Sequence, residues 1–67
     1  MIAFYIKNPL SGHYYRAAIH NNAQWTRSLD EAYGFHTHAI AVSTARAIQK
    51  EIGITPQILK IEVIDWE

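Results

Sequence analysis

One amphipathic segment constrains the fold of this 67-residue chain more than any other feature of its sequence. Over residues 38–52, apolar residues recur at the spacing of one helix face: Ala41, Ala45, Ile48 and Ile52. Thr37 precedes the segment as a helix N-cap, and Gly53 follows it where a left-handed residue ends a helix. Because this is the single long helix that the sequence predicts, it can cover only one face of a sheet.

Segments that alternate between inward-facing and outward-facing residues flank this helix and predict strands. They are residues 2–7, 14–20, 24–27 and 58–66. The first two are joined by Asn-Pro-Leu-Ser-Gly, a turn sequence, and so predict an antiparallel hairpin. Ser28, with Glu31 three residues later, has the spacing of a capping box and predicts a short helical turn.

The order of these elements, β-β-(β)-α-β, predicts one α+β domain over residues 1–67. Its sheet is three- to four-stranded and mainly antiparallel, with the long helix packed on one face. A chain of this length leaves no room for a second domain. The sequence has no cysteine, so stability depends on its apolar content, 49% of residues, or on association with a partner.

The alternation assigns each strand residue to a face of the sheet. The face under the helix is predicted to hold Ile2, Phe4, Ile6, Tyr15, Ala17, Ile19, Leu59, Ile61 and Val63. The uncovered face also holds Ala18, and its other residues form the predicted binding surface: Tyr5, Lys7, Tyr14, Arg16, His20, Lys60, Glu62, Ile64 and Trp66. Trp25 and Phe35, which follow turns, are expected to close one end of the core.

Aromatic residues mixed with Lys and Arg on a sheet face have three interpretations. They are typical of protein interfaces, where Tyr, Trp and Arg act as anchors. They also suit base stacking beside phosphates, or they merely stabilise a thin sheet through cross-strand pairs. The formal net charge of zero ranks nucleic acid below protein as a partner. A net charge of zero also removes the self-repulsion that keeps small proteins monomeric. A second copy of this chain, in a homodimer, is therefore another candidate partner.

A second surface is left open as an alternative to the sheet face. Ile40, Val42 and Ala47 flank the apolar stripe of the helix and form a shoulder that a partner could contact. The sequence alone does not decide between the two surfaces.

Residue types that carry chemistry are present but do not form a recognisable site. His36 and His38 could offer two imidazoles, yet no cysteine, no His-Glu-x-x-His motif and no third ligand accompany them. Ser11, His13 and Asp30 could be combined into a triad, yet the chain lacks a nucleophile elbow and a glycine-rich phosphate loop. We therefore predict no enzyme activity, no metal and no cofactor.

The sequence contains no apolar run long enough to span a bilayer. Residues 1–6 have no basic stretch leading into a long apolar segment, as a signal peptide would. We expect a cytoplasmic protein with no membrane partner.

Several short motifs together carry a resemblance that covers nearly the whole chain. They are Phe4-Tyr5-Ile6-Lys7-Asn8, Gly12-x-Tyr14-Tyr15, Trp25-Thr26, Ala32-x-x-Phe35-x-Thr37 and the alanine-bearing helix. This pattern is similar to that of very small β-β-α-β proteins encoded by phages and other mobile elements, a group that includes anti-CRISPR and other host-defence inhibitors. The resemblance carries no functional residue with it.

The resemblance implies a stoichiometric protein-binding module that occludes a host protein surface, such as a defence complex, in the host cytoplasm. Many such inhibitors are strongly acidic, and this chain is not, which argues against mimicry of DNA. Two alternatives stay open. One is a nucleic-acid-binding accessory protein that uses Tyr5, Tyr14, Arg16 and Lys60, and the other is a purely structural protein that forms oligomers.

Overall fold

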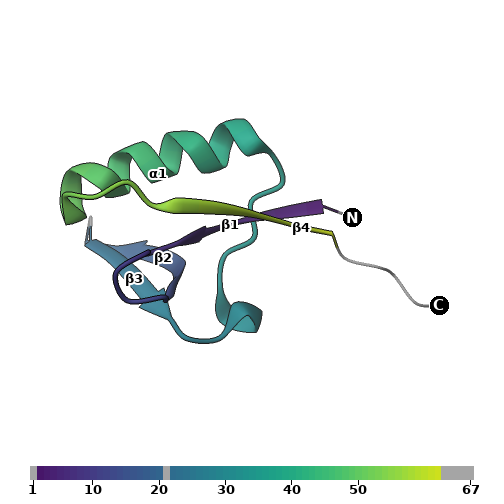
Figure 1. Ribbon diagram of the computed structural model, residues 1–67, viewed down its shortest axis with the longest axis horizontal. Helices are drawn as coiled ribbons and strands as arrows, with labels where there is room; N and C mark the ends of the chain where they lie inside the picture. Colours follow the sequence, from purple (N-terminus) through teal and green to yellow (C-terminus); the bar gives the residue numbers. More distant parts are fainter. Residues whose placement is uncertain (1, 21, 63–67) are drawn as a thin grey trace.

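The computed structural model describes residues 2–20 and 22–62. Its elements in chain order are β1 (Ile2–Lys7), β2 (Tyr14–Ile19), β3 (Asn22–Thr26), the 3-10 turn η1 (Leu29–Glu31), α1 (His38–Ile52) and β4 (Gln57–Glu62). The strands form one antiparallel sheet in the order β3-β2-β1-β4. Helix α1 lies along β1 and β4 (Figure 1). The predicted α+β fold is confirmed.

The first and last residues of α1 agree with the prediction, because each end of the helix is capped by a residue next to it in the sequence. The Thr37 hydroxyl accepts a hydrogen bond from the Ile40 N–H, at 3.3 Å. Gly53 ends the helix with a φ of 78°, and its N–H donates to the Gln49 carbonyl at 2.9 Å. The residues that α1 buries are those of the predicted stripe, Ala41, Ala45 and Ile48.

The hairpin between β2 and β3 turns earlier than predicted. His20 has a φ of 51° and lies in the turn, so β2 ends at Ile19 and β3 begins at Asn22. The helical turn η1 is present, but Ser28 makes no side-chain cap. Its N–H donates instead to the Thr26 hydroxyl, at 3.2 Å.

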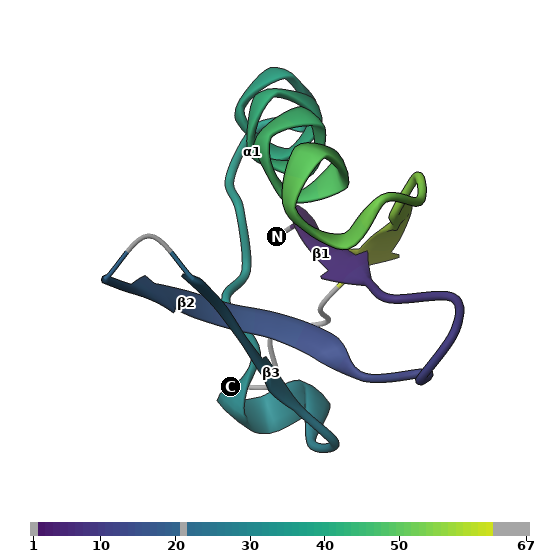
Figure 2. The same ribbon diagram turned by 90° about the vertical axis from the view of Figure 1, so that its left-hand side faces the viewer.

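The first two strands diverge, and a later segment lies between them (Figure 2). Strands β1 and β2 share one pair among the described residues, Lys7 with Tyr14. Beyond it, Phe35 exchanges two backbone hydrogen bonds with Phe4, of 2.8 and 2.9 Å. Residues 33–35 therefore act as a short bridging segment inside the sheet.

The bridging segment 33–35 contacts β2 as well as β1. The Tyr33 N–H donates to the Tyr15 carbonyl at 3.0 Å. Between these contacts lies Gly34, where an added Cβ would stand 3.2 Å from the Tyr5 hydroxyl and 3.4 Å from the Ala3 Cβ. Any larger residue there would have to displace the Tyr5 ring, because that ring already occupies the space.

The core lies between α1 and the sheet. Its buried members are Ile6, Tyr15, Phe35, Ala41, Ala45 and Ile48. The Tyr15 ring meets Trp25 edge-on at 6.2 Å and stacks on Phe35 at 6.0 Å, measured between ring centroids. Phe35 is buried in the core as expected, and Trp25 is half-buried and packs against it.

The predicted alternation of β2 is wrong beyond its first half. Pairing with β3 shifts between Tyr15 and Ala17, so Arg16 is an extra residue, a β-bulge. Beyond the bulge, Ala18 pairs with Ala23, which packs against the core, and Ile19 is 52% exposed. An inserted residue reverses which side of the sheet the following side chains face.

The predicted faces of β4 are also wrong. Tyr5 pairs with Leu59, and Phe4 pairs with Lys60. Directly opposite residues of antiparallel strands project to the same side. Leu59 and Ile61 therefore lie on the open face of the sheet, and Lys60 and Glu62 lie on the helix side. The cause is that β4 has apolar residues on both faces, so its own pattern does not set its register.

Replacing Ala45 with phenylalanine should lower the free energy of unfolding by about 1–3 kcal/mol, because α1 lies too close to the sheet for a larger side chain. Ala45 is 7% exposed. Ala39→Phe, at an exposed position of the same helix, is the matched control and should change it little. Denaturant unfolding of both variants measures the difference, and equal losses would show that the proposed buried face of α1 is wrong.

Gly34→Val should be destabilising because its side chain would meet the Tyr5 ring. We expect a loss of about 1–3 kcal/mol in the free energy of unfolding. In a Tyr5→Ala background the same substitution should cost less, and a double-mutant cycle measures that coupling. An equal cost in both backgrounds would contradict the contact.

Candidate functional site

Three of the predicted surface residues lie together on the open face of the sheet. Tyr5, Lys7 and Tyr14 project to the same side of β1 and β2, and each is half-buried. The Lys7 Nζ stands 5.8 Å from the centroid of the Tyr14 ring. The ammonium group thus lies over an aromatic face, which attracts a cation.

The other predicted surface residues do not join this group. Arg16 is the bulge residue of β2, and His20 lies in the following turn. Lys60 and Glu62 are exposed on the helix side of β4. Ile64 and Trp66 lie outside the described residues.

The open face contains apolar residues that the sequence interpretation placed in the core. Ala3 pairs with Ile61 and Tyr5 pairs with Leu59, all four half-buried. One signal could have revealed this. Ile58 and Leu59 are adjacent, so an apolar side chain of β4 must face away from the core whichever register is chosen.

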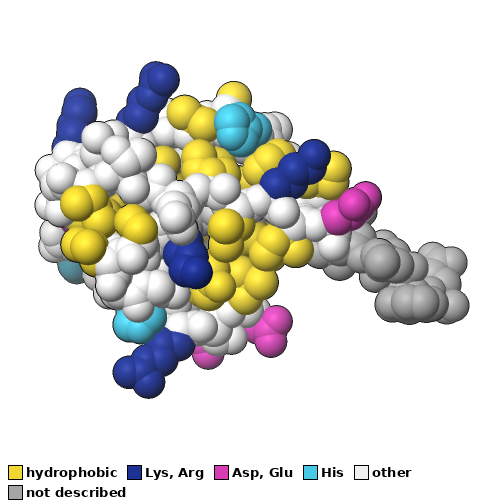
Figure 3. Space-filling model, in the orientation of Figure 1, with side chains coloured by type: hydrophobic (Ala, Val, Ile, Leu, Met, Phe, Trp, Pro, Cys, Tyr) yellow, Lys and Arg dark blue, Asp and Glu magenta, His cyan; other side chains and the backbone are white. Residues whose placement is uncertain are grey.

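We define the open-face patch as Ala3, Tyr5, Lys7, Tyr14, Leu59 and Ile61. Hydrophobic side chains gather in the middle of the face shown in Figure 3, over β1 and β4 and below α1, with charged side chains around them. No second helix among the described residues covers this side of the sheet.

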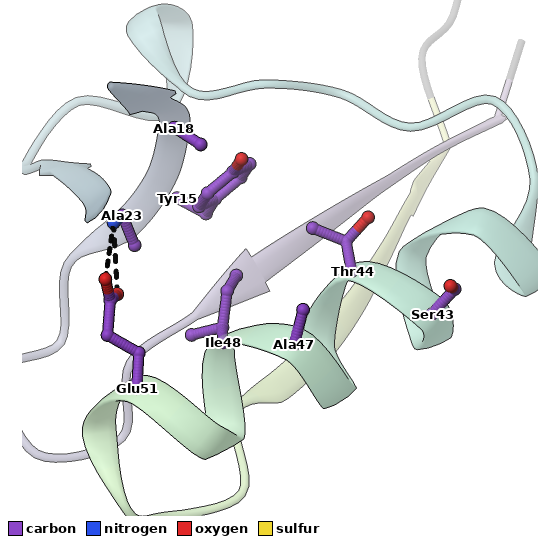
Figure 4. A pocket seen from close by; sticks show the side chains of 8 residues that line it. All are labelled: Tyr15, Ala18, Ala23, Ser43, Thr44, Ala47, Ile48 and Glu51. Carbon is purple, nitrogen blue, oxygen red and sulfur yellow. Dashed lines mark hydrogen bonds between the residues drawn. The ribbon is translucent and has the colours of Figure 1, made fainter. Parts of the chain in front are cut away.

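Helix α1 follows β1 and β4, while β2 turns away from it (Figure 2). A groove lies between α1 and the β2–β3 hairpin (Figure 4). It is lined by Tyr15, Ala18, Ala23, Ser43, Thr44, Ala47, Ile48 and Glu51. Beyond Tyr15, a second hollow reaches Tyr33 and Phe35. Of the predicted shoulder, Ala47 lines this groove, whereas Ile40 and Val42 do not. Ile40 is 55% exposed.

Glu51 joins the last turn of α1 to β3 at one end of this groove (Figure 4). Both of its carboxylate oxygens accept from the Ala23 backbone N–H, at 3.1 and 3.0 Å. A charged acceptor makes this a stronger hydrogen bond than a neutral one. It holds the far edge of the sheet against the end of the helix.

The pKa of Tyr15 is raised above its usual value. Burial in the core is the largest cause, followed by the negative charge of Glu51 and the neighbouring Tyr33. The phenol of Tyr15 is therefore held in its neutral form at the floor of the groove. This position suits packing and does not suit an activated nucleophile or base.

The two histidines considered as metal ligands are both exposed: His36 lies just before α1, and His38 is its first residue. The His38 ring contacts Phe4 edge-on, with 5.4 Å between centroids. Within residues 2–20 and 22–62, no group of three or more His, Cys, Asp or Glu side chains could hold a metal ion. The Ser11 hydroxyl, a member of the hypothetical triad, accepts from the His13 backbone N–H at 3.2 Å within its own turn.

No helix in the described part of the chain is long and apolar enough to cross a membrane. Comparison with protein-family models, with curated proteins and with solved structures found no match.

The raised pKa of Tyr15 makes stability fall at alkaline pH. Unfolded tyrosine ionises near pH 10, whereas the folded protein keeps this proton to higher pH. The contribution is therefore complete below about pH 10 and is lost as pH rises through the folded pKa. Tyr15→Phe should show a shallower alkaline decline in the free energy of unfolding, measured by denaturant titration. Equal slopes for the two proteins would contradict this cause.

Proposed function

We propose that this chain is a non-enzymatic protein-binding module that docks through the open-face patch. The observation that carries the proposal is the composition of that patch, in which half-buried Tyr5, Tyr14, Leu59 and Ile61 lie together on an uncovered sheet face. Aromatic residues surrounded by polar groups are typical of interface centres, where a few anchors supply most of the binding energy.

A protein partner is favoured over nucleic acid by the register of β4. That register removes Lys60 from the face that holds Tyr5 and Tyr14. Lys7 remains as the cation of the patch, and it already lies over the Tyr14 ring. Binding along a phosphate backbone needs several cations on one surface, and its affinity depends steeply on salt.

The resemblance to small phage and mobile-element proteins supports a narrower version of the same proposal. On that basis the partner is a host protein, and the chain inhibits it by covering a surface that the host protein needs. The balanced charge of the chain, six basic and six acidic residues, fits direct occlusion better than mimicry of DNA.

Substitutions on the patch should weaken partner binding without unfolding the protein. Wild type, Tyr14→Ala and Leu59→Ala would be used as baits, with Lys50→Ala on the exposed side of α1 as control. Proteins retained by wild type and control are identified by mass spectrometry, and the affinity of the purified partner is then measured. We expect each patch variant to bind about thirtyfold more weakly, as for the loss of an interface anchor.

Thermal unfolding of each bait separates lost binding from lost folding. A partner held with unchanged affinity by both folded patch variants would refute docking through this face. Retention of nucleic acid, with an affinity that falls steeply as salt rises, would favour the accessory-protein alternative.

A further inference from the structure

The two edges of the sheet differ in how their backbone is protected. Edge strands expose unpaired N–H and C=O groups that can pair with another chain. On β3, the outward N–H of Ala23 is already occupied by both carboxylate oxygens of Glu51. An added strand would have to displace a charged hydrogen bond at that position, so this edge is partly protected.

The edge formed by β4 has no such protection within residues 2–20 and 22–62. Gln57–Glu62 pairs with β1 along six consecutive positions. The opposite side of β4 is the end of the sheet. None of the side-chain hydrogen bonds between described residues reaches the β4 backbone. This edge is free to accept a strand.

We propose that β4 pairs with β4 of a second copy of this chain, antiparallel, about a twofold axis at Ile61. Charge complementarity selects this register. With Ile61 opposite its own copy, each Lys60 lies opposite Glu62 of the other chain, which forms two cross-strand ion pairs. The proposal is independent of docking through the open-face patch.

The neighbouring registers are less favourable. Moving the axis to Lys60 sets two lysines directly opposite each other, and like charges in that position destabilise a strand pair. Moving it to Leu59 sets each Lys60 opposite Ile58, and moving it to Glu62 sets two carboxylates opposite each other. Of these four positions, Ile61 alone pairs opposite charges.

A twofold axis at β4 leaves only the two β3 edges at the ends of the joined sheet. Glu51 occupies one backbone N–H on each of those edges, which disfavours the addition of further strands and favours a dimer.

The first test exchanges the charges. Sedimentation over a range of micromolar concentrations should show a dimer for wild type. Lys60→Glu places carboxylates opposite carboxylates and should weaken the dimer about tenfold or more. The double variant Lys60→Glu with Glu62→Lys restores opposite charges in the same register and should recover the dimer. Arg46→Glu, the same charge change on an exposed helix position, should leave it unchanged.

The second test reads the register directly, since the native chain has no cysteine. Ile61→Cys places its thiol opposite that of the copy, within reach of a disulfide, and mild oxidation should give a covalent dimer. Leu59→Cys lies on the same strand and face but four residues from its equivalent, so it should stay monomeric on a denaturing gel. Circular dichroism checks that both variants are folded.

A monomer at every concentration for wild type would overturn the proposal. A dimer that survives Lys60→Glu unchanged would also overturn it, because contact through the open faces does not involve the helix side of β4. Cross-linking through Leu59→Cys and not Ile61→Cys would refute this register. All these outcomes concern self-association alone and leave the result of partner capture to test the proposed function separately.

Discussion

The paired backbone hydrogen bonds between Phe4 and Phe35 hold this fold together at a point where it would otherwise open. Among the described residues, strands β1 and β2 share a single pair beside their turn and then separate. The segment that contains Phe35 satisfies the backbone of β1 on one side, and through Tyr33 it bonds β2 on the other. Buried backbone groups without partners are costly, so the divergence of the strands depends on this segment.

The shape of the molecule follows from that divergence. Helix α1 follows the half of the sheet made by β1 and β4, and β2 and β3 turn away from it (Figure 2). Tyr15 fills the space at the division, between Trp25 and Phe35. The groove and the hydrogen bond from Ala23 to Glu51 both arise where the helix no longer covers the sheet.

The core is small, so many apolar side chains are left on the surface of the protein. Of the large side chains, Ile6 alone among the described residues is fully buried, and no disulfide adds to its stability. Small domains that lack such links usually gain stability through partners. The open-face patch and the β4 edge lie next to each other, since Leu59 and Ile61 belong to both. A dimer through β4 would place two copies of the patch on one continuous sheet face.

Local features of the sequence determined the elements. The helix could be predicted to the residue because Thr37 and Gly53 act within one turn of its ends. The faces of β1 and the burial of Tyr15 followed from simple alternation. Tyr5, Lys7 and Tyr14 were placed correctly on one surface because the turn between β1 and β2 sets their register.

Only the tertiary structure decided which residues lie beside Tyr5, Lys7 and Tyr14 on the sheet. The bulge at Arg16 depends on pairing with β3, and nothing in the order of residues 14–19 signals it. The register of β4 depends on its contact with β1, which is distant from it in the sequence. Ile58 lies on one face of β4 and Leu59 and Ile61 on the other, so an apolar side chain faces away from the helix in either orientation. Backbone pairing with β1 exchanged Lys60 and Glu62 for Leu59 and Ile61, and so turned a predicted charged face into an apolar one.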